Sequence, residues 1–194
     1  MEIQQIFKEL PILETDRLLL RKLRREDAED IFQYASKEEV ARNVTWDAHL
    51  TLSDTEEYLD FAFAQYEGSS VAPWGIELKE TNSLIGTIDF VNWHPKHKKA
   101  EIGYVLSPFY WNKGLTTEAA NKIIEYGFIN MDLIRIQARC FSTNKASEKV
   151  MKKIGMMFEG VERQALYTKG QHRDVMVYSI LREEYERNEK RKRL

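Results

Sequence analysis

The stretch YWNKGLTTEAANKII, residues 110–124, holds the side chains of this chain that are best suited to chemistry. It joins a strand-like run to a helix, and the first backbone amides of a helix have no partner inside that helix. The helix dipole adds partial positive charge there, so an anion such as a phosphate is the natural ligand. Gly114 permits a close approach of the backbone to that ligand. Lys113 adds a positive charge, and Thr116 and Thr117 add hydroxyl donors.

A plain structural alternative explains the same residues. An ordinary connection between a strand and a helix, with Thr116 as the N-cap and Glu118 in the first turn, would have this composition. The stretch lacks the Gly-Lys-Ser/Thr ending of a Walker loop and the Gly-x-Gly-x-x-Gly of a dinucleotide-binding turn. One glycine and two threonines are therefore a weak signal for phosphate binding when they are taken alone.

Metal and thiol chemistry find little support in the sequence. Asp89, His94 and His97 come nearest to a metal-ligand pattern, but both histidines lie in a lysine-rich turn and no third ligand has suitable spacing. We therefore expect no metal site. The single cysteine, Cys140, lies among apolar residues, which favours a buried core thiol over a nucleophile. One cysteine cannot form an internal disulfide, so a reducing compartment fits.

The composition predicts one soluble domain over residues 1–194. A net charge of −2 gives no global case for DNA or an anionic membrane as a partner. No apolar run approaches the roughly 18–20 residues of a membrane helix, and the N-terminus lacks the core of a signal peptide. We expect a cytoplasmic protein. The basic end KRKRL, residues 190–194, is interpreted as a solvated tail, with an RNA- or ribosome-binding arm as the alternative.

Apolar periodicity predicts the elements that position the 110–124 stretch. Strands are expected over 15–23, 72–79, 83–93, 100–107 and 133–141, with two more in 157–181 around Lys169-Gly170. Helices are expected over 24–36, 50–68, 116–130 and 142–156, and the charged tail is expected to continue as a helix. Ser53 or Asp54 is the predicted N-cap of the second helix, and Gly155 the C-cap of the fourth. Because hairpins alternate with helical crossovers, the sheet of this α/β domain must be mixed.

Several short motifs occur along the chain in a fixed order. They are LETDRLLLR (13–21), EIGYVL (101–106), PFYWNKGLTTEA (108–119), NKAS (144–147), KIGM (153–156), EG (159–160), DV (174–175) and YSIL (178–181). This series resembles the GNAT superfamily of acetyltransferases, and most of all its branch of Rim-type ribosomal-protein N-terminal acetyltransferases. The resemblance runs from about residue 13 to 185. Several motifs at matching intervals are far more specific than the glycine turn alone.

The resemblance implies a GNAT fold, which is a mixed, mostly antiparallel twisted sheet of about seven strands flanked by helices. It also implies acetyl-CoA as the cofactor. The pyrophosphate would lie on the turn, and the pantetheine arm would pair with the preceding strand like an extra strand. Asn144 would contact the pantetheine, although it also suits the N-cap of the next helix. The cofactor-binding residues implied in this way are Val105, Leu106, Trp111, Asn112, Lys113, Gly114, Leu115, Thr116, Thr117 and Asn144.

Two positions depart from the family pattern. Asn112 replaces the usual first glycine, and asparagine tolerates left-handed backbone conformations. Thr116 replaces a small residue, so its β-branched side chain either crowds the pyrophosphate or donates a hydroxyl to it. We expect cofactor binding to survive both changes.

Acetyl transfer to an amine needs a neutral amine, a polarised thioester carbonyl and a thiolate that leaves with a proton. Glu101 shares a strand face with Gly103 and Val105 by alternation. We predict that Glu101 is the base, acting directly or through water. The alternative is that it caps a strand edge or pairs with a lysine of the turn at 96–99.

The leaving sulfur and the carbonyl need donors of their own. Ser147 matches the family position suspected of donating a proton to the sulfur, and the alternative is a first-turn hydroxyl that satisfies the backbone. A backbone amide near Val105 or Leu106 is predicted to polarise the carbonyl.

The resulting prediction is an acetyl-CoA-dependent N-acetyltransferase whose acceptor is a primary amine, with a protein N-terminal α-amine of the ribosomal-protein type as the acceptor that the resemblance suggests. The alternative acceptor is a small amine such as a polyamine, an amino acid or an antibiotic. The acidic segment 56–60, if it borders the cleft, favours a cationic acceptor of either kind. An alternative from a different functional class is a non-catalytic acyl-CoA-binding regulatory module. The unusual residue Thr116 in the cofactor turn is the reason to keep it. The oligomeric state stays open, a homo-oligomer included.

Overall fold

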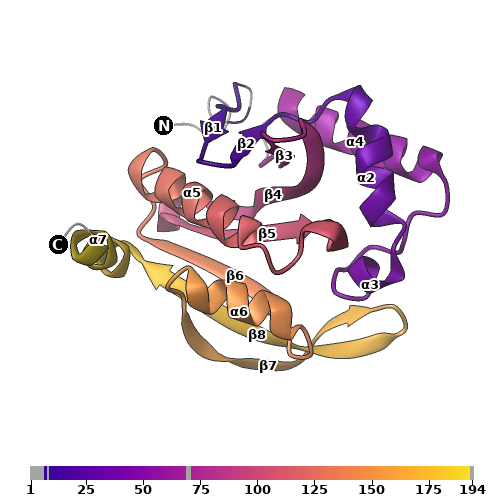
Figure 1. Cartoon of the computed structure of the whole chain (residues 1–194). Helices are drawn as coiled ribbons and strands as arrows, with labels where there is room; N and C mark the ends of the chain where they lie inside the picture. The colour runs from indigo at the N-terminus through magenta and orange to yellow at the C-terminus, as the bar shows by residue number, and fades with distance from the viewer. Residues whose placement is uncertain (1–6, 8, 69–70, 193–194) are drawn as a thin grey trace.

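A computed structural model describes residues 7, 9–68 and 71–192 of the chain, and Figure 1 shows their arrangement. Eight strands in these residues form one sheet in the order β1-β2-β3-β4-β5-β6-β8-β7. Neighbouring strands run antiparallel except β5 and β6, which run parallel. The strands are β1 (Leu13–Glu14), β2 (Leu18–Arg21), β3 (Trp74–Leu78), β4 (Ser83–His94), β5 (Lys99–Leu106), β6 (Arg135–Phe141), β7 (Met157–Thr168) and β8 (Gln171–Leu181).

The sheet confirms the predicted mixed, mostly antiparallel architecture. It has one strand more than the seven expected, because the two residues of β1 pair with β2 just ahead of the predicted first strand. That first strand is also shorter than the predicted 15–23, since only Leu18–Arg21 is in the ladder. The hairpin around Lys169-Gly170 is present, and both turn residues have positive φ.

Helices follow the strands on both sides of the sheet (Figure 1). They are α2 (Ala28–Ala35), α3 (Glu38–Ala41), α4 (Leu52–Glu67), α5 (Leu115–Ile129), α6 (Lys145–Lys153) and α7 (Arg182–Lys192), and short 3-10 turns cover Arg25–Asp27, Pro95–His97 and Pro108–Tyr110. Helix α3 was not predicted, because four residues are too few to show a helical period. Helix α7 confirms that the charged tail continues as a helix, while residues 193–194 of the KRKRL end lie outside the described residues. No helix of the described ranges is both long and apolar enough to cross a membrane.

The helix caps differ from those expected from the sequence. Helix α4 is capped by Thr51 and not by Ser53 or Asp54, because Asp54 lies in the first turn and accepts the Thr51 amide at 2.9 Å. Helix α5 begins at Leu115 with Gly114 as its N-cap, so Thr116 is not the cap. The C-cap of α6 is Ile154 rather than the predicted Gly155, which follows it with φ +83°.

Candidate functional site

The parallel strands β5 and β6 separate before they end. Their pairing runs only from Lys99 opposite Arg135 to Ile102 opposite Ala138. Beyond that point β5 continues to Leu106 and β6 to Phe141 without pairing to each other. Since parallel strands end at the same edge of a sheet, α5 and α6 both begin beside this split.

The edge of β5 along the split carries free backbone groups. The Ser107 amide donates to the Ile85 carbonyl of β4 at 2.8 Å. Because successive amides of a strand point to opposite sides, those of Leu106 and Tyr104 point to the split and that of Val105 points to β4. The Leu106 carbonyl accepts the Trp111 indole N–H at 2.7 Å, which ties the turn to the strand end.

The turn between β5 and α5 contains two left-handed residues. Asn112 has φ 61° and Gly114 has φ 78°, so the asparagine that departs from the family pattern adopts the conformation expected of the glycine it replaces. Within the described residues, no amide from 113 to 117 donates a hydrogen bond, and the first helical bond runs from the Glu118 amide to the Gly114 carbonyl. Leu115 is buried in the core, while Thr116 and Thr117 stay partly exposed. The result is a row of unpaired amides at a helix N-terminus, which is an anion site.

The turn is held in place by the N-terminal segment. Both the Thr15 hydroxyl and the Arg17 amide donate to Glu118 Oε1, at 2.6 and 2.9 Å. The Arg17 guanidinium donates to Glu118 Oε2 and also to the Lys113 carbonyl, at 2.7 and 3.0 Å. Burial raises the pKa of Glu118, but these donated bonds outweigh it and the pKa is lowered overall. The residues of this contact belong to two motifs that are far apart in the sequence, LETDR and TEA, and the sequence alone did not indicate that they meet.

The start of α6 lies on the β6 side of the split. The Asn144 side chain caps α6 by accepting the Ser147 amide at 3.1 Å, as the structural alternative predicted. The Ser147 hydroxyl also forms a 2.8 Å hydrogen bond with the Tyr104 hydroxyl of β5. Burial raises the pKa of Tyr104 well above its usual value. Sequence reasoning missed Tyr104, because alternation alone only placed it on the opposite face of β5 from Glu101.

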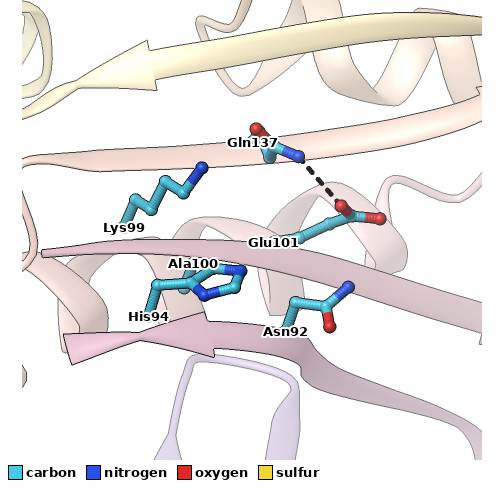
Figure 2. Close-up of a pocket in the computed structure, with 6 residues that line it drawn as sticks. All are labelled: Asn92, His94, Lys99, Ala100, Glu101 and Gln137. Carbon is cyan, nitrogen blue, oxygen red and sulfur yellow. Dashed lines mark hydrogen bonds between the residues drawn. The ribbon is translucent and has the colours of Figure 1, made fainter. Parts of the chain in front are cut away.

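Glu101 lies on the opposite face of β5 from Tyr104 and is almost fully buried. Gln137 donates to Glu101 Oε2 at 2.9 Å, and the Arg139 guanidinium donates to Oε1 at 2.9 Å. Figure 2 shows Glu101 and Gln137 beside a hollow of about 50 Å³, which Asn92, His94, Lys99 and Ala100 also line. The ion pair is therefore made with Arg139 rather than with a lysine of the 96–99 turn. Whether Glu101 is the base stays a prediction.

Asp89 of β4 is a second carboxylate on this face. It pairs with Gly103, two residues along β5 from Glu101. Burial and, as a smaller cause, the charge of Glu101 together raise the pKa of Asp89 to about 7. The sequence analysis considered Asp89 only as a metal ligand, because nothing local indicates that it faces Glu101. No group of three histidine, cysteine, aspartate or glutamate side chains that could hold a metal occurs in the part of the chain that the structure describes.

Two other segments bound this face. Helix α4 contributes Tyr58, whose pKa is raised by burial and by the charge of Asp89. The tip of the β7–β8 hairpin meets the loop after α3, where the Thr168 hydroxyl donates to the Thr45 carbonyl at 3.2 Å. The Lys169 ammonium donates to the Ala41 carbonyl at 2.7 Å. The face around Asp89 and Glu101 thus lies between the helical N-terminal half and the hairpin.

Comparison with known proteins gives consistent matches. A family model described as "Acetyltransferase (GNAT) domain" matches residues 17–157. The Uncharacterized N-acetyltransferase YoaA of Bacillus subtilis (strain 168) is 40% identical over 172 residues, 89% of this chain and 97% of that protein. The Putative ribosomal N-acetyltransferase YdaF of the same strain is 38% identical over 114 residues, 58% of this chain and 62% of that protein. The crystal structure of the acetyltransferase (GNAT family) from Bacillus anthracis is similar with a TM-score of 0.80 at 33% identity, over 89% of this chain and 99% of that one.

Proposed function

The chain belongs to the GNAT family of acetyl-CoA-dependent N-acetyltransferases, and we propose that its acceptor is the α-amine at the N-terminus of a protein. The observation that carries this proposal is the open surface beside Glu101. No helix of the described residues covers the sheet face around Gln137 and Arg139, and the edge strand β7, which lies beyond β8, is mostly exposed. The hollow at Glu101 is small, with a volume of about 50 Å³. An open sheet surface suits an extended peptide that presents only its first residue to the split.

The residues at the split fit acetyl-CoA on two observations. The unpaired amides from 113 to 117 offer donors for the pyrophosphate, with the Thr116 and Thr117 hydroxyls beside them. The unpaired edge of β5, with the Leu106 amide directed to the split, offers a ladder for the amides of the pantetheine arm. Trp111 and Asn112 shape the turn and Lys113 adds charge. Val105 lines the split, and Asn144 keeps its side-chain amide N–H groups available because only its oxygen caps α6.

Arg17 braces the cofactor turn from outside the site. We expect Arg17→Ala to weaken coenzyme A binding roughly 3- to 10-fold, because a half-exposed ion pair of about 1 kcal/mol then no longer holds Glu118 and the turn in place. Isothermal titration calorimetry with coenzyme A measures the change. Arg25→Ala is the matched control, since it removes an exposed pair with Asp60 away from the turn. Equal affinities of the two variants would show that the brace has no role in binding.

Acetyl-CoA, when bound, supplies an acetyl thioester whose C–S bond breaks as the acceptor nitrogen forms a C–N bond with the acetyl carbon. The predicted polariser of the carbonyl is a backbone amide near Val105 or Leu106, and the direction of the Leu106 amide toward the split supports Leu106. We propose that the Ser147 hydroxyl gives a proton to the departing sulfur, and its hydrogen bond with the Tyr104 hydroxyl holds it in position. On the other face of β5, the carboxylate of Glu101 is the predicted site for the acceptor's proton.

The free energy of deprotonation also favours an α-amine over a side-chain amine. An α-ammonium has a pKa near ~8 and a lysine ammonium near ~10.4, so neutralising the α-amine costs about 3 kcal/mol less. A carboxylate is a weak base, so a site that relies on carboxylates deprotonates an α-ammonium much more readily than a lysine ammonium. The name of YdaF, which shares 38% identity over 114 residues, points to a ribosomal acceptor. The relatives also include enzymes named for a small polyamine, so family membership alone does not choose the acceptor.

An acceptor panel tests the proposal. The full chain is mixed with acetyl-CoA and either free N-terminal peptides, the same peptides with blocked N-termini, or polyamines, amino acids and aminoglycosides. Release of free thiol is followed, and we expect turnover with free peptides that blocking removes. Selective turnover of small amines would overturn the protein acceptor. Saturable coenzyme A binding without turnover of any acceptor would instead indicate a binding module.

A further inference from the structure

We propose that Asp89 is the catalytic residue that takes the proton from the acceptor ammonium, and that Glu101 is a positioning residue beside it. This inference rests on the proposed N-acetyltransferase function and refines the assignment of the base. It follows from where the two carboxylates lie and from which of them is free.

Asp89 lies at the point where the sheet opens. It pairs with Gly103, and the last pair between β5 and β6 is Ile102 opposite Ala138. Gly103 is therefore the first residue of β5 without a neighbour on the β6 side. A Cβ at position 103 would lie 2.8 Å from Val91 Cγ1 and 3.1 Å from Asp89 Oδ1, so both side chains lie over this residue and the missing side chain makes room for them. An amine that reaches the split from the Glu101 face meets Asp89.

The hydrogen bonds separate the two carboxylates. Both oxygens of Glu101 accept hydrogen bonds, one from Gln137 and one from the Arg139 guanidinium. Each Glu101 oxygen is therefore already engaged, and the Arg139 guanidinium holds the carboxylate in place. Among the described residues, no side chain or amide donates a hydrogen bond to the Asp89 carboxylate, which is only partly buried. Asp89 therefore has lone pairs available for a proton.

The surroundings of Asp89 set the pH at which it works. Glu101 of β5 faces it, and Tyr58 and Tyr66 of α4 lie close enough for its charge to raise their pKa values. Burial together with the Glu101 charge raises the pKa of Asp89 to about 7. Efficient general bases have pKa values near the working pH, because they are then both ionised and able to hold a proton.

The proton step balances without a further reactant. One N–H bond of the acceptor ammonium breaks and its proton passes to Asp89 Oδ, which turns the carboxylate into a carboxylic acid and leaves the nitrogen lone pair free. That lone pair forms the C–N bond as the C–S bond breaks, and the nitrogen then loses a second proton, which replaces the one that Ser147 gives to the departing sulfur. Asp89 forms no bond to the acetyl group and returns its proton to solvent. Glu101 takes up no proton in this step, and its charge raises the proton affinity of Asp89.

The first test is the pH dependence of kcat/KM, measured with the best acceptor of the panel for Asp89→Asn, Glu101→Gln and the exposed control Asp132→Asn. We expect Asp89→Asn to lower kcat/KM by roughly 10²- to 10³-fold at neutral pH and to remove the acid limb with its midpoint near 7. Glu101→Gln should keep the limb and move it to lower pH. Loss of the limb in Glu101→Gln, with the limb intact in Asp89→Asn, would overturn the inference in favour of Glu101.

The second test needs no acceptor or cofactor. Carboxyl ¹³C NMR of the full chain should show an aspartate that titrates with a midpoint near 7, that is absent in Asp89→Asn and that shifts to lower pH in Glu101→Gln. A midpoint below about 5 for Asp89 would overturn the inference. The proposed function can fail separately, because the kinetic test works equally well if the panel selects a small amine. A chain that acetylates nothing would overturn both proposals.

Discussion

Gly114→Val is expected to weaken coenzyme A binding by roughly 10- to 100-fold, because valine at a left-handed position costs on the order of 1–3 kcal/mol. Gly114 has φ +78° and is the N-cap of α5, so its conformation orients the unpaired amides of the turn. The nearest atom to a Cβ there is Arg17 Nη2 at 3.7 Å, an ordinary contact. Backbone conformation rather than a steric clash therefore causes the loss. Isothermal titration calorimetry with coenzyme A gives the affinity directly.

Gly170→Val is the matched control for this variant. Gly170 also has a positive φ, +73°, and a Cβ there would meet no atom within 4 Å. It lies in the β7–β8 turn, so valine imposes a similar backbone cost away from the amides of α5. We expect Gly170→Val to lose stability while it keeps its coenzyme A affinity. Wild-type affinity in Gly114→Val would mean that the turn does not hold the pyrophosphate.

Arg21→Ala is expected to lower the free energy of unfolding by about 3–5 kcal/mol, because it leaves two buried carboxylates without their partner. Arg21 donates two hydrogen bonds of 2.8 Å to Asp27 and one of 2.5 Å to Glu77. All three side chains are at most 11% exposed. Asp27 also accepts the Arg24 amide at 2.7 Å, so the group fixes the entry of α2 against β2 and β3. Guanidinium chloride denaturation at neutral pH measures the loss.

An exposed ion pair provides the comparison for Arg21. The Arg25–Asp60 pair has side chains that are 58% and 60% exposed, and such pairs contribute about 0–1 kcal/mol. Arg25→Ala should therefore change the midpoint of denaturation only slightly. If Arg21→Ala were as mild as Arg25→Ala, the buried group would have no special role in stability.

Local patterns predicted most of the fold because they depend on residues close together in the chain. Apolar periodicity located β3 to β8 and four of the helices. The helix ends were less accurate: Ser53 or Asp54 was expected to cap α4, whereas Thr51 is its N-cap and Asp54 completes the capping box. The two-residue β1 was missed because it depends on a partner strand rather than on its own sequence.

The candidate site also has a part that the sequence predicted and a part that it did not. Asn112 and Gly114 could be identified from sequence, because a left-handed turn before a helix restricts the residue types that it accepts. The Rim-like order of motifs also led to the family. The brace of Glu118 by Thr15 and Arg17 joins residues about 100 positions apart, and no local pattern encodes it.

The order of motifs, the turn at 112–114 and the succession of strands and helices were determined by the sequence by itself, because steric preference and side-chain periodicity act within a few residues. The split between β5 and β6, the Tyr104–Ser147 hydrogen bond and the position of Asp89 over Gly103 were decided only by the tertiary structure. Each of these depends on the register of one element against another. That register is set by the packing of the whole core, so the residue that we infer to be the base became visible only when the sheet was assembled.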